Sequence, residues 1–192
     1  MEPTSPKNLS SASEDFRHML AKWEAVRNPG ETHELLAELA GQWDVNVRFH
    51  GGEEPLESRA AATKRVVHGG RFLMEELTGE IHAPDRTGRM RLEPYSATRL
   101  LGFDRFKQAW VGAFVENQNT CLLSFVGVSS PDSASHEVVL FGACDEPMLD
   151  LHDTTMKYLL RIEGSDRHLW EVFAMAAGGR KVFDFVYRRR PE

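Results

Sequence analysis

The feature that most constrains this fold is an alternation of apolar and polar residues that begins at Trp43 and returns along the rest of the chain. Its first segment places apolar side chains at every second position: Trp43, Val45, Val47 and Phe49. A period of two is typical of a strand with one buried face. Similar segments follow at residues 57–67, 72–81, 96–103, 109–116, 121–128, 137–143, 154–162, 168–175 and 182–189.

Turn residues such as Gly51-Gly52, Gly69-Gly70 and Gly178-Gly179 separate these segments, and no helical period lies between them. A parallel sheet is excluded, because each of its crossovers needs a long connection that is usually a helix. We therefore predict a mainly β fold in which about ten antiparallel strands follow one another as an up-and-down meander. A meander of this length is expected to close into a barrel, because closure removes its two unpaired edges.

Two helices are expected before the first strand. The first begins after Ser13, a suitable N-cap, and ends at Asn28-Pro29-Gly30. Its apolar residues recur at steps of three and four and form one stripe: Phe16, Met19, Leu20, Trp23 and Val26. A second, shorter helix is expected from Glu31 to Ala40, because Gly41 is suited to end it.

The chain thus divides into three predicted parts: a disordered tail at residues 1–12, a helical segment at 13–40 packed on the barrel, and the barrel domain at 41–190. The tail has almost nothing apolar to bury. The apolar stripe of the first helix is also compatible with binding to a partner or a membrane surface. Its polar face, however, lacks the lysine and arginine density of an interfacial helix.

The composition favours one globular domain that acts away from nucleic acids and membranes. At 192 residues, with 41% apolar and 27% charged residues, the chain can bury a full core. The formal net charge of -6 argues against binding to nucleic acid, which depends on clustered lysine and arginine. Residues 1–13 lack the apolar core of a secretory signal, and no apolar stretch approaches the roughly 20 residues that span a bilayer. We therefore expect a cytoplasmic protein.

The last two expected strands carry apolar residues on both faces. Pairing across Gly178-Gly179 places Trp170 and Val172 on the same face as Phe185 and Tyr187, and we assign this face to the barrel interior. The opposite face is not purely polar, since it includes Phe173, Met175 and Val186. Because such a face needs a cover, we expect either the N-terminal helix or a second subunit on it, and predict a homodimer.

Several short motifs, taken together, resemble one known family. They are Gly41-Gln42-Trp43-Asp44-Val45, Gly69-Gly70-Arg71-Phe72-Leu73 with Glu76 and Gly79, Gly102-Phe103-Asp104, Glu116-Asn117, Gly142-Ala143-Cys144-Asp145-Glu146-Pro147 and Tyr187-Arg188-Arg189. Residues 30–189 resemble the DUF1579 family of uncharacterised bacterial proteins. The resemblance implies a calycin-type, lipocalin-like barrel, and no reaction or ligand. In the barrels that the chain resembles, a basic side chain of the last strand lies across the first-strand tryptophan, which implies that Arg189, or alternatively Arg188, covers Trp43.

The interior is predicted to be partly hollow and to bind a small apolar or amphipathic molecule, because a barrel of about ten strands has more room than one of eight. The residues expected to line it are Phe72, Met74, Glu76, Trp110, Phe114, Glu116, Trp170, Phe185 and Tyr187. Gly112, between Trp110 and Phe114, removes bulk on this face. The alternative is that the aromatic side chains meet and fill the barrel, which would then be a structural homo-oligomer without a ligand.

An enzyme is the other alternative. Glu76 and Glu116 could act as buried acids of raised pKa, and His152 could pair with Asp150 in the acidic segment at residues 144–153. No spacing typical of a metal site, an activated nucleophile or a phosphate-binding loop accompanies these groups. We therefore name no catalytic residue and no metal site.

No cofactor is expected, with one alternative. Nitrobindin-like barrels have ten strands and open with a similar Gly-x-Trp, and this resemblance would make haem the cofactor. His152 and His168 are the candidate ligands, although neither matches a proximal histidine residue by residue.

Overall fold

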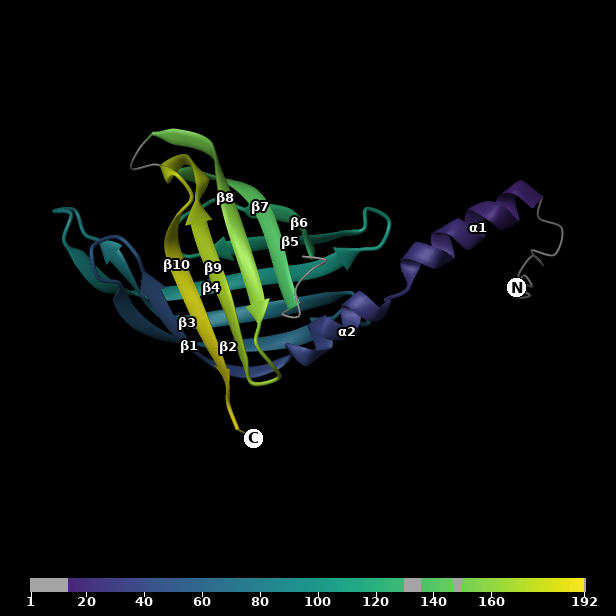
Figure 1. Cartoon of the computed structure of the whole chain (residues 1–192), viewed down its shortest axis with the longest axis horizontal. Coiled ribbons are helices and arrows are strands. Elements are labelled where there is room, and N and C mark those ends of the chain that lie inside the picture. Colours follow the sequence, from purple (N-terminus) through teal and green to yellow (C-terminus); the bar gives the residue numbers. More distant parts are fainter. Residues whose placement is uncertain (1–13, 130–135, 147–149, 192) are drawn as a thin grey trace, which may run out of the picture.

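The chain forms a closed barrel of ten antiparallel strands, as the alternation predicted (Figure 1). The computed structural model describes residues 14–129, 136–146 and 150–191. The strands are β1 (Gly41–Phe49), β2 (Leu56–Val67), β3 (Phe72–Pro84), β4 (Met90–Asp104), β5 (Ala109–Glu116), β6 (Leu123–Ser129), β7 (His136–Glu146), β8 (Leu151–Ile162), β9 (Arg167–Ala174) and β10 (Arg180–Arg189). A 3-10 turn, η3 (Met175–Ala177), joins β9 to β10. Consecutive strands pair along the chain, and β1 pairs with β10 to close the barrel.

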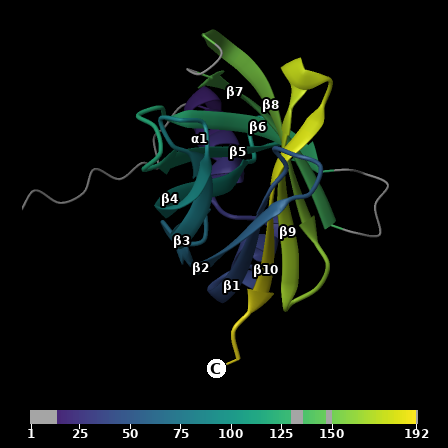
Figure 2. The ribbon, with the colours of Figure 1, turned by 90° about the vertical axis from the view of Figure 1, so that its left-hand side faces the viewer.

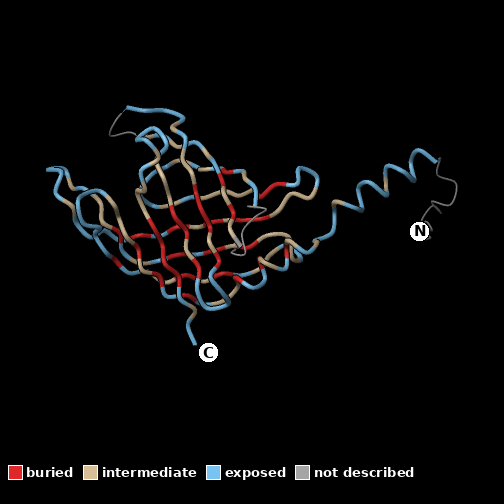
Figure 3. Tube along the Cα trace, viewed as in Figure 1, coloured by how far each residue is buried: buried red, intermediate tan, exposed pale blue. Residues whose placement is uncertain are grey.

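The barrel has two walls that face each other. Strands β7–β10 run across the direction of strands β2–β5 in Figure 1, and Figure 2 shows both groups from the side. Interior side chains alternate with exterior ones along each strand, so the cross-strand register decides which residues meet inside. Buried residues concentrate in the middle of the strands and exposed residues in the loops (Figure 3).

The core consists mainly of aromatic and aliphatic side chains. Val45 and Val47 of β1 point inward beside Tyr187 and Phe185 of β10. The largest fully buried side chains are Trp43, Trp110, Tyr187, Phe125, Leu36, Leu140, His168, Val47 and Val138. A histidine among them shows that the interior is not purely apolar.

The second N-terminal helix, α2 (Glu31–Glu38), covers one end of the barrel. Leu36 and the following Leu39 are buried in the core. The indole Nε1 of Trp43 donates a hydrogen bond to the Leu39 carbonyl at 3.0 Å, which ties the end of α2 to β1. The prediction that this part of the helical segment packs on the barrel is confirmed.

The first helix, α1 (Glu14–Arg27), projects away from the barrel (Figure 1) and buries none of its residues. Met19 and Trp23 of its apolar stripe are 60% and 53% exposed. The prediction that α1 packs on the barrel is therefore wrong. The Arg71 guanidinium donates two hydrogen bonds, at 2.7 and 3.1 Å, to the Arg27 carbonyl. These bonds hold the C-terminal end of α1 at the barrel, although the helix itself projects away from it.

The barrel domain has the bounds given by its strands: β1 begins at Gly41 and β10 ends at Arg189. The tail predicted at residues 1–12 lies outside the described residues. Among the described residues, neither helix has the length and apolar character needed to cross a membrane.

The third strand, β3, faces the opposite way from the prediction. Leu73, Glu75 and Leu77 point into the barrel. The outer face of β3 carries Phe72, Met74 and Glu76. Apolar residues occur at both parities of this strand, so its local pattern does not select a face. Pairing selects it, because Leu73 lies opposite the inward Leu101 of β4.

Candidate functional site

Three charged side chains on neighbouring strands point into the barrel. Lys64 of β2, Glu75 of β3 and Arg99 of β4 are direct cross-strand partners, and all three are buried. The Glu75 carboxylate accepts from Lys64 Nζ at 2.6 Å through Oε2 and from Arg99 Nη1 at 3.2 Å through Oε1. One carboxylate thus lies between two cations.

The opposite side of the interior contributes Tyr187 of β10 and His168 of β9. The Tyr187 hydroxyl donates to Glu75 Oε1 at 3.0 Å. Nε2 of His168 lies 2.7 Å from Lys64 Nζ, and its ring stacks on Tyr187 with centroids 4.2 Å apart. Lys64, Glu75, Arg99, His168 and Tyr187 are called the interior cluster below.

Burial and charge together set the protonation states in the interior cluster. Burial lowers the pKa of Lys64 to about 8, although Glu75 opposes this shift. Burial raises the pKa of Glu75, but Arg99 and Lys64 outweigh it, so its pKa is below the ordinary value. Burial, with the charges of Lys64 and Arg99, holds the pKa of His168 far below its usual range. His168 is therefore neutral, and near pH 7 the interior cluster has two cations and one anion.

The neutral His168 has a defined role in this arrangement. Its Nε2 accepts a hydrogen bond from the Lys64 ammonium, so the proton of the imidazole is on Nδ1. Nδ1 of His168 and Nε of Arg99 are both buried without a hydrogen-bond partner in the described part of the chain. An unsatisfied buried donor costs about 1–3 kcal/mol, so both groups can gain from an added acceptor.

A small cavity adjoins the interior cluster. Its lining residues are Leu39, Lys64, Leu73, Glu75, Arg99, Leu101, Leu160 and Trp170. Its volume is about 10 Å³, which is about the space needed for one water molecule. The Arg99 guanidinium lies over the Trp170 ring at 3.9 Å, so one wall of the cavity is a cation–π pair. Leu39, which directly follows α2, covers this cavity.

Trp43 closes the same end of the barrel. Its ring meets His168 edge-on with centroids 4.3 Å apart, and Arg189 Cζ lies over the ring at 4.3 Å from its centroid. The guanidinium of Arg189 also donates to the backbone carbonyls of Glu38 and Ala40 at 2.5 and 2.7 Å. The contact of Arg189 with Trp43 that the resemblance implied is confirmed, and Arg188 is not the residue that makes it.

Most residues predicted to line the interior do point into the barrel. They are Trp110, Phe114, Glu116, Trp170, Phe185 and Tyr187. Phe72, Met74 and Glu76 do not, because β3 has the opposite parity. The side chain of Glu76 is 50% exposed and pairs with Arg65 at 3.3 Å. Its neighbour Glu75 has the interior position instead.

The space expected beside Gly112 is filled. A Cβ atom at Gly112 would collide with the ring of Phe125 and the carbonyl oxygen of Leu100. The Phe125 ring also contacts Tyr158 and Trp170, with centroids 5.4 and 5.7 Å away. The prediction of free space at this position is therefore wrong, because an aromatic side chain from β6 uses the room that the glycine leaves.

Glu116 also points into the barrel, but its hydrogen-bond partners lie outside the interior cluster. Its Oε2 accepts from the Tyr95 hydroxyl at 2.7 Å, and its Oε1 accepts from Asn119 at 2.6 Å. Burial raises the pKa of Glu116, while Tyr95 and Arg99 oppose the shift. Both oxygens are thus engaged by neutral donors.

The groups considered for catalysis or haem binding are not brought together. His152 is 78% exposed and lies 3.5 Å from Asp145, not beside Asp150 as predicted. His168 is enclosed by Trp43, Tyr187 and Lys64, which leaves no room for a haem against its ring. The geometry therefore supports neither the acid–histidine pair nor a haem-ligating histidine.

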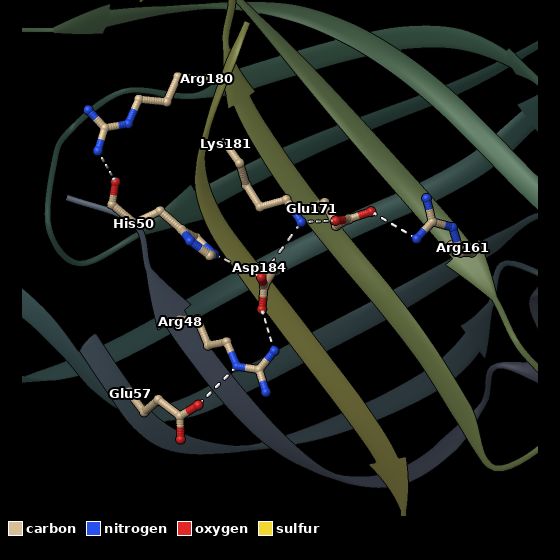
Figure 4. Close-up of polar contacts among 8 residues, drawn as sticks. All are labelled: Arg48, His50, Glu57, Arg161, Glu171, Arg180, Lys181 and Asp184. Carbon is tan, nitrogen blue, oxygen red and sulfur yellow. Dashed lines mark hydrogen bonds and ion pairs between the residues drawn. The ribbon is translucent and has the colours of Figure 1, made fainter. Parts of the chain in front are cut away.

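A second set of charged groups lies on the outer wall, where Figure 4 shows side chains from β1 and the residue after it, and from β2, β8, β9 and β10. Glu171 and Asp184 are cross-strand partners and both are buried. Lys181 bridges the two carboxylates, and it lies 3.8 Å from Asp184. Two carboxylates directly opposite would repel each other, so the bridging ammonium is stabilising. The flanking ion pairs are made by Arg48, His50, Glu57 and Arg161. These ion pairs connect neighbouring strands on the outer wall.

Sequence reasoning missed Lys64, Glu75 and Arg99. Each interrupts an inward row of mainly apolar residues, and for β3 that row reads Leu73, Glu75, Leu77. A charged residue at the centre of such a row is the signal that could have found the site. For Glu75 this signal was hidden because the opposite parity of β3 was chosen.

The fold and the interior cluster define the class of this protein: a closed ten-stranded antiparallel barrel with a filled, charged interior. The family model described as "Protein of unknown function (DUF1579)" matches residues 28–189, so the chain belongs to this family. A search of curated proteins found no match.

A solved structure, "Crystal Structure of Rv2717c from M. tuberculosis", has a similar fold. The TM-score is 0.60 at 16% sequence identity, and the match covers 85% of this chain and 100% of that chain. At this level of identity, the likeness concerns the fold alone.

Proposed function

We propose that the barrel binds a small amphipathic molecule whose negatively charged group is held by the interior cluster. The observation that carries this proposal is the excess of one cation in a fully buried set of groups, beside a cavity and an unpartnered Nε of Arg99. Burying an uncompensated charge costs several kcal/mol. An anion in the cavity would offset that cost and would give Arg99 the acceptor it lacks.

The rest of the cavity wall indicates the other half of the ligand. Leu39, Leu101, Leu160 and Trp170 offer apolar contacts next to the two cations. A carboxylate with a short hydrocarbon body matches this combination. A cavity of about 10 Å³ does not hold such a molecule, so the ligand must displace Leu39 and the end of α2 that covers the site.

The small volume of the cavity favours a second candidate. If α2 does not move, the cavity holds one water molecule beside Arg99, and the barrel is a structural unit without a ligand. The two candidates differ in one measurable property, namely saturable uptake of an anionic probe.

The test is isothermal titration of the full chain with sodium hexanoate, with 1-hexanol as the uncharged probe of the same length. We expect saturable binding of hexanoate only. Arg99→Gln should abolish it, whereas Arg99→Lys should retain part of it because the charge is kept. Arg65→Gln is the matched control, since Arg65 lies on the outer face. Equal binding of hexanol would point to a purely apolar site, and no binding of either probe to folded protein would favour the structural candidate.

A cytoplasmic location and a role without catalysis stay predictions. Cell fractionation would test the first of these.

A further inference from the structure

The apolar stripe of α1 is held away from its own barrel. Arg71 bonds to the Arg27 carbonyl, and Arg105 donates to the Asn28 carbonyl at 2.8 Å. These contacts hold the end of α1 to the turns that follow β2 and β4. Met19 and Trp23 remain more than half exposed in the described chain.

The outer wall of the barrel carries an apolar belt. One cross-strand row runs from Val111 through Val126, Phe141 and Lys157 to Phe173. Val128 on β6 extends it. Val126, Val128 and Phe141 are 51%, 60% and 47% exposed. Neighbouring apolar side chains at such exposure are typical of an interaction surface.

We propose that α1 of one copy packs on the belt of a second copy, so that two chains exchange their N-terminal helices in a C2 dimer. Two features support a second copy as the occupant. The chain itself supplies both an exposed apolar stripe and an exposed apolar belt, and a two-fold axis uses each of them twice. Lys157 lies within the belt with its ammonium 5.2 Å from the Phe173 ring, and the first turn of α1 offers Glu14 and Asp15 as acidic partners.

The apolar area for this contact comes from both copies. Each arm brings Met19 and Trp23, which are 60% and 53% exposed, and each belt brings Val126, Val128 and Phe141. A two-fold axis buries each of these side chains twice, so the centre of the interface is apolar.

The first test is sedimentation velocity of the full chain from 1 to 100 µM. We expect a dimer whose dissociation constant rises at least tenfold in Trp23→Glu and in Phe141→Glu. Ala21→Glu, on the opposite face of α1, and Thr78→Glu, on the outer face of β3 away from the belt, are the matched controls and should leave it unchanged.

The second test locates the contact. A copy with Met19→Cys is mixed with a copy with Val126→Cys, both in a background with Cys121→Ser and Cys144→Ser, and a short bismaleimide is added. Covalent dimers should form in the mixture and not with either variant alone. The proposal is overturned by a monomer at 100 µM, by a dimer that tolerates both Glu substitutions, or by a monomer whose α1 binds lipid vesicles instead.

Discussion

Glu75 and Glu76 are adjacent in the chain but have opposite surroundings. The carboxylate of Glu75 is buried between Lys64 and Arg99, while Glu76 is half exposed beside Arg65. A surface pair of this kind contributes about 0–1 kcal/mol, whereas removing one partner of a buried pair leaves an uncompensated charge. Comparing substitutions at these two residues therefore shows how much more stability is lost when a buried carboxylate is removed than when an exposed one is.

We expect Glu75→Gln to lower the free energy of unfolding by about 3–5 kcal/mol, because it leaves Lys64 and Arg99 facing each other without a carboxylate. Glu76→Gln is the control, and its change should stay within about 0.5 kcal/mol. Urea unfolding followed by tryptophan fluorescence measures both. Equal effects of the two substitutions would contradict the assignment of Glu75 to the interior.

Lys64 also predicts a pH dependence. Its pKa in the folded protein is about 8, below the value of roughly 10.4 expected for an unfolded chain. Between these values the unfolded chain binds more protons at this residue, so its contribution to stability rises with pH across that window. The free energy of unfolding of wild type minus that of Lys64→Met should therefore increase from pH 7 to pH 10. A difference that does not change with pH would argue against the shifted lysine.

At the level of elements, the barrel closes where three segments meet. Trp43 on β1 contacts Leu39 after α2 and Arg189 on β10, and Arg189 bonds to carbonyls at the end of α2. One helix end and the first and last strands are thus held by two side chains. In α1, by contrast, Met19 and Trp23 of the stripe are more than half exposed and no residue is buried, so only α2 is part of the core.

Trp43→Ala should destabilise the protein by about 3–5 kcal/mol, as truncation of a buried aromatic residue does. Arg189→Ala should cost less, because its guanidinium is partly exposed. The two effects should couple in a double-mutant cycle by about 0.5–3 kcal/mol, since the side chains are in contact. Chemical denaturation of the four proteins measures the coupling, and strict additivity would rule out an energetic role for the pair.

At the level of the whole molecule, aromatic side chains meet inside the barrel, and a cavity of about 10 Å³ adjoins the interior cluster. Phe125 enters the space left by Gly112, and Tyr158 and Trp170 continue the aromatic contact. The charged groups are placed together at the end that α2 covers. The ligand proposed above would have to displace this cover, because the cavity beneath it has a volume of only about 10 Å³.

Gly112→Ala tests whether the interior is filled in solution. The added methyl group would meet Phe125, so we expect a loss of about 1–3 kcal/mol from overpacking. Gly52→Ala, in the exposed loop after β1, is the control and should be close to neutral. Thermal or urea unfolding measures both variants. A neutral Gly112→Ala would mean that the interior has spare room there.

The period of two from Trp43 onward was sufficient to predict the strands, their antiparallel order and the closed barrel. Those properties depend on local alternation and short turns, which any segment shows by itself. The face of β3 was not predictable in this way, because apolar residues occupy both of its parities. The register with β2 and β4 decided it, and placed Glu75 between Lys64 and Arg99. A buried charge is stable only beside its partners, and these are brought together only by the tertiary structure.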